Sequence, residues 1–191
     1  MALLKEIEKR RAYRAYSTEE LKTDVLVRLV EAAHTAPSSA NNQPWRIVTV
    51  VDPDRLAHIR ETLSAGNYWA KKAPVIAAFV TNPNWSMRLG ERDLAFFELG
   101  MAAMAYQIQA VAEDLIAHPI VGFNNPEAKK VLGIGDGEVL EILMVVGKRG
   151  DDGELSEKHR MSERSPRIRK PLDQVSSFDT WHDGLVPPVK N

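Results

Sequence analysis

Arginine is concentrated at two places in the sequence, one near each end of the chain. Arg10, Arg11 and Arg14 form the first cluster, and Arg167 and Arg169 belong to the second. Guanidinium groups bind phosphate through paired hydrogen bonds, so each cluster is a candidate anion site. Taken alone, such a cluster is more often a solvated surface or a helix end, where cations complement the helix dipole. The arginines indicate a ligand only if other polar groups join them.

Two polar loops could supply those groups. Residues 36–45 read Ala-Pro-Ser-Ser-Ala-Asn-Asn-Gln-Pro-Trp, and residues 67–74 form a second irregular stretch. Proline lacks an N–H and disfavours helix at the residue before it, so the first segment is an ordered loop. Such residues also dominate ordinary connectors. Together with the arginines, the loops could enclose an anionic ligand that also needs amide-like partners.

Side chains that could perform catalysis unaided are missing. The sequence has no cysteine, which excludes disulfides, thiolate nucleophiles and cysteine-ligated metals. Its five histidines are scattered without metal-ligand spacing, and no nucleophile elbow, Walker loop or His-Glu-x-x-His pattern occurs. We therefore expect no catalytic side chain and no metal site. In an enzyme of this kind, a cofactor would supply the reactivity.

The composition is that of one globular domain. The chain has 191 residues, of which 44% are hydrophobic and 27% charged. Its formal net charge of -1 gives no basic field for nucleic acid. Lys5, Glu6 and Glu8 interrupt the N-terminal apolar residues, which argues against a signal peptide. We expect a cytoplasmic protein that binds neither nucleic acid nor membrane.

Hydrophobic patterning predicts both helices and strands. Helical periodicity is found at residues 3–11, after Thr23, and at residues 54–64 and 126–132. Runs rich in β-branched residues predict buried strands at residues 47–51, 75–80 and 139–146. From Lys148 to Lys170 the chain is polar and lacks periodicity, which predicts a long loop or an arm. Trp181, close to the end, suggests that the arm docks on something folded.

One predicted helix is exceptionally long and apolar. Its pattern runs from about Arg88 to Ala117, and residues 94–112 are apolar on almost every side. Such a helix is buried in a core or in a membrane. Glu98 and Gln107 make the membrane the poorer choice, because polar groups inside a bilayer are costly. A domain of this size would struggle to cover the helix alone, so we expect another subunit to cover part of it.

The segments, in their order along the chain, resemble the nitroreductase family of FMN-dependent oxidoreductases. The matching motifs are the arginine cluster, Pro-Ser-Ser-x-Asn-x-Gln-Pro, the Asn-aromatic stretch, the long helix, Pro-Ile-x-Gly-Phe and Pro-Arg-x-Arg-Lys-Pro-Leu. The resemblance implies an α+β fold with a central, mainly antiparallel sheet flanked by helices. It also implies a homodimer with FMN at the interface. Residues 1–147 would form the core, and residues 148–191 an arm packed on the partner subunit.

The resemblance also implies roles for particular residues. Arg10 and Arg11 would serve the phosphate of FMN, and Arg14 the N1–O2 edge of its ring. Asn67 would face the pyrimidine edge, with Lys71 as a neighbouring alternative. The loop residues Pro37, Ser38, Ser39 and Asn41 would come from the partner subunit. The remaining contacts would be Pro119, Ile120, Val121 and Gly122 beside N5, and Arg167 and Arg169 as a C-terminal phosphate clamp.

Two positions depart from the family pattern. Ala12 stands where a serine hydroxyl is usual, so one hydrogen bond to the phosphate end would be lost. Val121 stands where some relatives have a glutamate. This second difference bears on substrate preference.

The implied activity is that of an FMN-dependent NAD(P)H oxidoreductase. In the family, NADH or NADPH gives a hydride to flavin N5, and a small acceptor such as a nitroaromatic or quinone then takes it in a ping-pong cycle. Dehalogenation and enone reduction are served by the same fold. A flavin-storage protein without turnover, and an interaction protein built on the apolar helix, are the alternatives from other classes.

Overall fold

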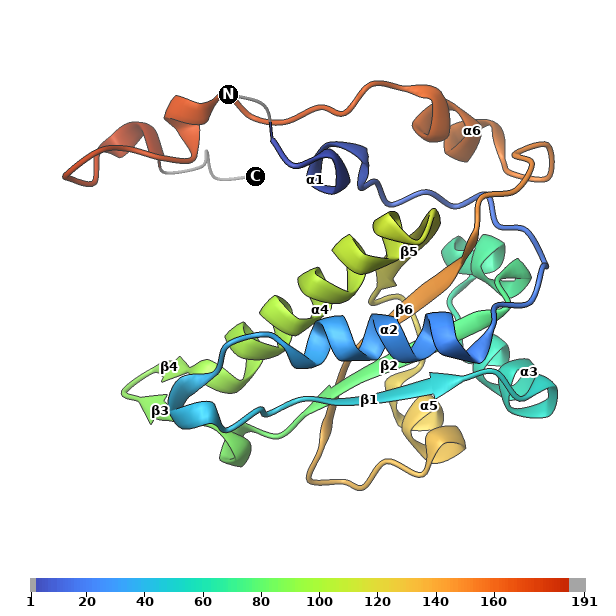
Figure 1. Cartoon of the computed structure of the whole chain (residues 1–191), viewed down its shortest axis with the longest axis horizontal. Coiled ribbons are helices and arrows are strands. Elements are labelled where there is room, and N and C mark those ends of the chain that lie inside the picture. The colour runs from blue at the N-terminus through green and yellow to red at the C-terminus, as the bar shows by residue number, and fades with distance from the viewer. Residues whose placement is uncertain (1–2, 186–191) are drawn as a thin grey trace.

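The computed structural model describes residues 3–185 and places a four-stranded antiparallel sheet between helices (Figure 1). The helices are α1 (Lys5–Lys9), α2 (Thr23–His34), α3 (Pro53–Glu61), α4 (Leu94–Ala112), α5 (Asn125–Leu132) and α6 (Glu157–Arg164). The strands are β1 (Arg46–Val50), β2 (Val75–Thr81), β3 (Arg88–Leu89), β4 (Arg92–Asp93), β5 (Leu115–Ile120) and β6 (Val139–Lys148). The predicted fold class is confirmed. Exchange of an arm between subunits stays a prediction.

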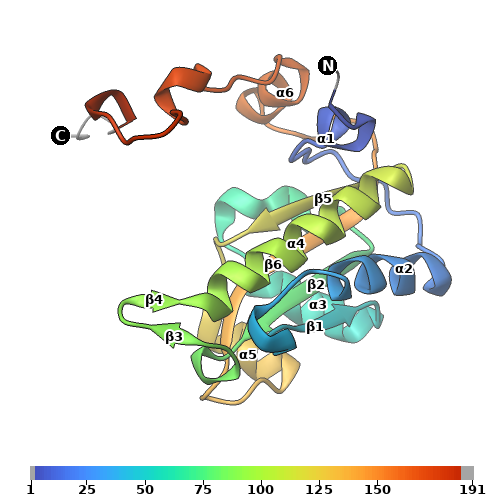
Figure 2. The same ribbon diagram turned by 60° about the vertical axis from the view of Figure 1, so that its left-hand side comes forward.

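The sheet has the strand order β1–β2–β6–β5, and every neighbouring pair is antiparallel. All residues of the central strand β2 are buried, because helices lie on both faces of the sheet (Figure 2). Alternate residues face opposite sides. Ile76 faces the cluster completed by α3 and α5, whereas Phe79 faces α2 and α4. This double cover explains why β2 reads as a continuous apolar run.

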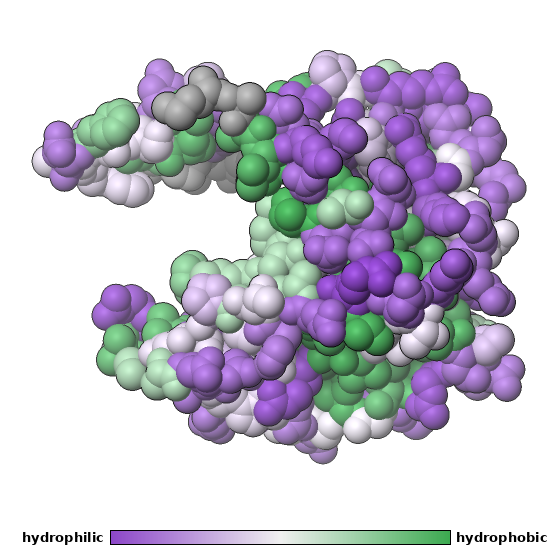
Figure 3. Space-filling view, viewed as in Figure 1, coloured by the Kyte–Doolittle hydropathy of each residue, from purple (hydrophilic) through white to green (hydrophobic). Residues whose placement is uncertain are grey.

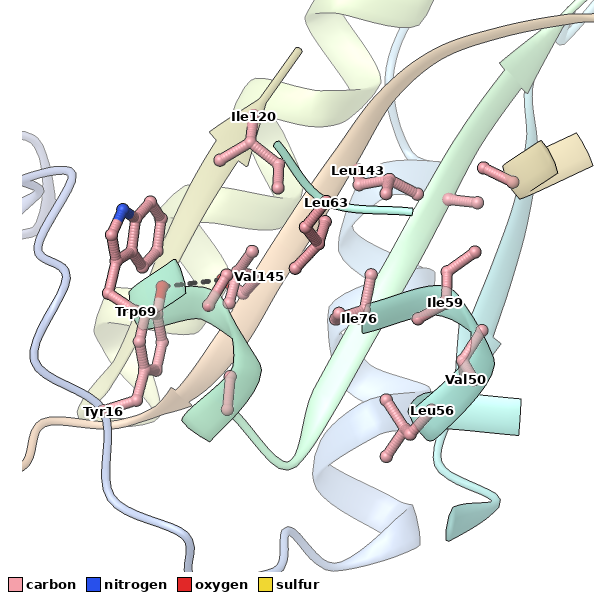
Figure 4. Packing of buried hydrophobic residues seen from close by; sticks show 14 of the residues in the cluster. Tyr16, Val50, Leu56, Ile59, Leu63, Trp69, Ile76, Ile120, Leu143 and Val145 are labelled. Atoms are coloured by element: carbon pink, nitrogen blue, oxygen red, sulfur yellow. Dashed lines mark hydrogen bonds between the residues drawn. The ribbon is translucent and has the colours of Figure 1, made fainter. Parts of the chain in front are cut away.

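The N-terminal segment is tied to the core at Tyr16. The Tyr16 ring stacks on Trp69 with centroids 6.0 Å apart, and its hydroxyl donates a hydrogen bond to Val145 O at 2.9 Å (Figure 4). The Gly150 N–H donates to Ala15 O at 2.9 Å. A Cβ on Gly150 would lie 2.5 Å from the backbone of Tyr16, so glycine permits this close approach. The residues before Tyr16 are therefore held at a fixed place.

Helix α4 is the one helix among the described residues that is long and apolar enough to cross a membrane, judged by length and composition. In the structure it packs on the sheet, with Leu99, Ala102 and Tyr106 buried. Phe97 and Met104 remain 65% and 40% exposed. The core of one chain therefore buries one side of α4 and leaves apolar residues on another.

The prediction of a helix from Arg88 to Ala117 was wrong at both ends. Residues 88–93 form the β3–β4 hairpin, in which Gly90 adopts φ 62°, and the Asp93 side chain caps α4. After α4, Asp114 at φ 55° reverses the chain, and residues 115–120 form β5. The apolar run of β5 has the composition of the preceding helix, so periodicity alone could not separate them.

The polar segment after Lys148 also contains a helix that the sequence did not reveal. Helix α6 begins at Glu157, where the Ser156 side chain caps the His159 N–H. Beyond α6 the chain projects away from the body and leaves a hollow beneath it (Figure 3). Phe178 and Trp181 are 94% and 71% exposed there, so Trp181 docks on nothing among residues 3–185. The boundary between a core of residues 1–147 and an arm packed on a partner stays a prediction.

Candidate functional site

The two ends of the chain form one basic pocket. After α1, the chain runs beside α6 and the segment that follows α6 (Figure 2). A pocket of about 320 Å³ opens between these segments. The arginines that line it are Arg10, Arg11, Arg14, Arg167 and Arg169. The fold thus joins two clusters that lie far apart in the sequence.

The pocket arginines are close enough to repel one another. Burial lowers the pKa of Arg10, and the charges of Arg167 and Arg169 lower it further. Among residues 3–185, no carboxylate lies within ion-pair distance of any of the five guanidinium groups. Positive charge gathered without acidic partners favours a bound anion.

The five arginines differ in how far their donors are already used. Arg10 donates to a glutamine side chain at 3.4 Å, and Arg11 donates to a backbone carbonyl of α6 at 3.2 Å. Arg169 donates only to the carbonyl that precedes it, at 2.8 Å. The Arg14 guanidinium has no hydrogen-bond partner among the described residues. Arg167, by contrast, donates three bonds to backbone carbonyls.

Arg14 lies where the basic pocket meets a second pocket of about 260 Å³ that Lys71 also lines. Its guanidinium carbon is 5.8 Å from the ring centroid of Trp69, within cation–π range. Its backbone N–H donates to Glu163 Oε1 at 2.8 Å. Glu163 is 3% exposed, and its Oε2 has no partner within the described chain. A buried carboxylate and an indole thus position Arg14 while its guanidinium stays available.

His118, in β5, contacts both Trp69 and the segment that carries Arg14. Its ring packs on Trp69 with centroids 4.6 Å apart. Burial lowers the pKa of His118 to about 4, and the charges of Arg14 and Arg10 add to this effect. The ring is therefore neutral near pH 7. Its Nδ1 lies 3.0 Å from Tyr13 O, which can only accept, so Nδ1 carries the proton and donates.

Asn67 and the segment after β5 meet at one place. Asn67 Nδ2 and the Ser64 N–H each donate to Gly122 O at 2.9 Å. A Cβ on Gly122 would lie 2.6 Å from Ser64 Oγ and 2.7 Å from Asn67 Nδ2, so a larger residue would displace these two side chains. Ile120 is buried in the core and can offer a ligand only its backbone. Val121 is 77% exposed.

The Pro-Ser-Ser-x-Asn loop lies at the other end of α4 (Figure 1). Glu98 of α4 is 3% exposed and accepts hydrogen bonds from the Ser39 N–H at 2.7 Å and the Ser86 hydroxyl at 2.6 Å. Arg10 reaches Gln107 on the same helix. The helix rises ~13 Å between Glu98 and Gln107. One chain therefore does not bring this loop to its own arginines.

The backbone of the loop is strained. Ala40, Asn41 and Gln43 have φ values of 48°, 57° and 50°. Left-handed backbone is unfavourable for residues with a Cβ, because the Cβ approaches the following carbonyl oxygen. The Ser38 hydroxyl accepts a bond from the Gln43 N–H at 2.9 Å and helps to hold the turn. Strain of this kind is common at ligand-binding loops.

The architecture has known relatives. The model of the nitroreductase family matches residues 7–148, most of the chain. This chain belongs to the nitroreductase family. The family membership that the motif order suggested is thereby confirmed.

Individual relatives cover the chain to different extents. An NADH dehydrogenase of Thermus thermophilus is 25% identical over 198 residues, covering 87% of this chain and 91% of that protein. An FMN reductase (NAD(P)H) of Bacillus subtilis is 32% identical over 97 residues, 51% of this chain and 38% of that protein. A crystal structure described as an oxidoreductase containing FMN is 26% identical with a TM-score of 0.85, covering 95% of this chain and 94% of that one.

The structure groups the predicted site residues of this nitroreductase into three sets. The five arginines share one pocket, and Asn67 joins the segment after β5. The loop residues Pro37, Ser38, Ser39 and Asn41 stand apart. Sequence reasoning missed the supporting residues. Glu98 carried a signal as a lone acid within an apolar helix; Glu163, in a polar stretch, carried none.

Proposed function

We propose that this nitroreductase is an FMN-dependent oxidoreductase that uses NADH or NADPH to reduce a small organic acceptor, such as a nitroaromatic or a quinone. The observation that carries the proposal is the basic pocket, in which arginines from both ends of the chain converge without acidic partners among residues 3–185. Guanidinium forks suit a phosphate group. The FMN and NAD(P)H in the names of the relatives support this choice of cofactor and co-substrate.

The donor set of the site fits FMN. Arg10, Arg11 and Arg169 have unused guanidinium donors for a phosphate. Arg14, held over Trp69, would stabilise the negative charge that the N1–O2 edge gains on reduction. When bound, FMN supplies the N5 atom that receives a hydride from the nicotinamide and passes it to the acceptor. No side chain of the protein needs to act as a nucleophile.

We infer that a complete site needs a second copy of the chain. The Pro-Ser-Ser-x-Asn loop does not reach the arginines of its own chain, and the exposed Phe97 and Met104 leave an apolar strip on α4. A homodimer would cover this strip and bring each loop to the arginines of the partner. Sedimentation of the purified protein should give twice the chain mass. A stable monomer that retains flavin would contradict the dimer.

An anaerobic titration tests the proposed activity. The protein as purified, or after addition of FMN and gel filtration, should show flavin absorbance. NADH or NADPH should then bleach that absorbance, and a nitroaromatic or quinone should restore it. Flavin absorbance that neither nucleotide bleaches would indicate flavin storage. A colourless protein that takes up no FMN would overturn the proposal and favour an interaction protein.

The choice of acceptor is a separate measurement. The reduced protein should be mixed under the same conditions with a nitroaromatic, a quinone, an enone and a halogenated phenol. The exposed Val121, in the segment after β5, offers an apolar surface, which favours apolar acceptors. Faster reoxidation of the flavin by the enone or the halogenated phenol would show that the acceptor belongs to that class. The proposed flavin chemistry would still hold.

A further inference from the structure

Helix α1 cannot be stable by itself. It has five residues, none of them buried, and its N-cap residue makes no side-chain capping bond. Helices much shorter than about 12 residues are marginal in water, because nucleation is costly. Its neighbours Leu3 and Leu4 are 62% and 67% exposed and add little packing. Something outside α1 must hold the turn from which Arg10 and Arg11 emerge.

Helix α1 packs on α4, and Arg167 adds hydrogen bonds that hold its C-terminus. Its Nη1 donates to Ile7 O at 3.3 Å, and its Nη2 donates to Glu8 O at 2.5 Å and to Arg10 O at 2.6 Å. The last carbonyls of a helix have no partner within the helix, and cations near them are favoured by the dipole. One guanidinium therefore caps the C-terminus of α1 with three bonds.

The same bonds limit what Arg167 can do for a ligand. Nη2 carries two hydrogens, and both are donated to carbonyls. Both two-point edges of a guanidinium, Nε with Nη2 and Nη1 with Nη2, include Nη2. Arg167 thus has no free edge for bidentate recognition of phosphate. Arg169, two residues later, uses only Nη1, so its Nε–Nη2 edge has no partner among the described residues.

We propose that Arg167 is a positioning residue of the anion site: it fixes the C-terminus of α1 so that Arg10 and Arg11 face the pocket, and it is not itself a phosphate ligand. This inference rests on the proposed function for the identity of the anion. It divides the expected C-terminal clamp into a helix cap, Arg167, and a ligand, Arg169.

Hydrogen exchange on the flavin-free protein tests the cap. The amides of Glu8 and Arg10, which are bonded to Leu4 O and Glu6 O, report on α1. In Arg167→Ala they should exchange at least about tenfold faster than in the unmodified protein, because local opening becomes easier. Arg169→Ala is the matched control and should leave them unchanged. Unchanged exchange in Arg167→Ala would overturn the cap, whether or not the protein binds FMN.

A double-mutant cycle on the FMN dissociation constant tests how Arg167 acts. Arg167→Ala should raise the constant about tenfold, but less than about twofold in an Arg10→Ala/Arg11→Ala background, because its effect passes through these two arginines. A direct phosphate ligand repelled by Arg10 and Arg11 would instead give an equal or larger effect in that background, which would overturn the proposal. Arg167→Lys should recover only part of the affinity, because lysine lacks the planar fork.

The two tests separate failure of this proposal from failure of the proposed function. If the unmodified protein binds no FMN, the proposed function is wrong and Arg167 positions no FMN ligand, although hydrogen exchange still decides whether it caps α1. If FMN binds but the effect of Arg167→Ala is undiminished in the Arg10→Ala/Arg11→Ala background, only the positioning role fails.

Discussion

The two ends of α4 carry polar segments that are stabilised in opposite ways. At its C-terminal half lies the basic pocket, where side chains of like charge gather and backbone carbonyls, a buried carboxylate and aromatic rings hold them. At its N-terminal half lies the Pro-Ser-Ser-x-Asn loop, which is nearly uncharged and whose backbone is strained. A single buried acid, Glu98, holds that loop through the Ser39 N–H and also accepts a bond from the Ser86 hydroxyl, in the segment before β3.

This difference suggests a division of work. The basic end supplies positive charge, so its affinity for an anion should depend on the salt concentration and on which guanidinium groups are free. The loop end offers backbone geometry, so its contribution should depend on how rigidly it is held. In the proposed homodimer, each site would combine one end of each kind. The following experiments alter one end at a time.

The largest expected effect is at the loop end. Glu98→Ala would leave the partly buried Ser39 N–H and Ser86 hydroxyl without their acceptor, and should lower the free energy of unfolding by about 3 kcal/mol. Urea denaturation measures this loss. Glu98→Gln keeps one acceptor oxygen and should lose less. If the alanine variant is as stable as the glutamine variant, Glu98 does not hold the loop.

The next effect is at the basic end and depends on pH. The pKa of His118 is about 4 in the folded protein and about 6.5 when unfolded, so the unfolded state binds more protons between these values. The free energy of unfolding should therefore fall as pH drops through 6.5 toward 4, by about 2 kcal/mol from this group between pH 7.5 and pH 5. His118→Gln should lack that part of the pH dependence.

Denaturation at pH 7.5 and pH 5 measures the His118 effect as a difference between proteins. His58→Gln is the matched control, because it makes the same substitution at an exposed histidine of α3. If His118→Gln and the unmodified protein show an equal pH dependence, then folding does not lower the pKa of His118.

A smaller effect concerns the flavin. If Arg14 lies at the N1–O2 edge, its charge stabilises reduced FMN more than oxidised FMN, so Arg14→Ala should lower the midpoint potential. A difference of ~1.4 kcal/mol corresponds to ~30 mV for a two-electron couple. Arg169→Ala should lower affinity and leave the potential unchanged, since the phosphate does not change charge. Potentiometry on FMN-saturated protein measures both. An unchanged midpoint in Arg14→Ala would remove Arg14 from the ring edge.

Part of this picture could be predicted from the sequence. The strands β2 and β6 were predicted correctly because apolar, β-branched runs are typical of buried strands. The family resemblance supplied the order of the motifs. The strand β5 was missed because its apolar residues continue those of α4, and the turn at Asp114 has no glycine or proline to announce it. Local patterns indicate elements well only where composition changes at their ends.

The site was less predictable than the fold, for a physical reason. Residue types identified the arginines, but which guanidinium groups are free depends on distant carbonyls, as Arg167 shows. Glu163 becomes important only because α6 packs against the Arg14 backbone. The left-handed conformation at Ala40 has no signal at all, since alanine rarely adopts it. Such features arise from tertiary contacts and are absent from local sequence.

The smallest expected effect tests the strain at Ala40. Replacing alanine by glycine normally destabilises a protein, because glycine loses more backbone freedom on folding. At φ 48° and ψ 24° the cost of a Cβ in left-handed backbone should exceed this loss, so Ala40→Gly should raise the free energy of unfolding by roughly 0.5–1 kcal/mol. Ala57→Gly, at an exposed position within α3, is the matched control and should lower it by about 1 kcal/mol. Urea denaturation of both variants gives the comparison. Loss of stability in both would mean that the loop end is relaxed, and its difference from the basic end would then lie in charge alone.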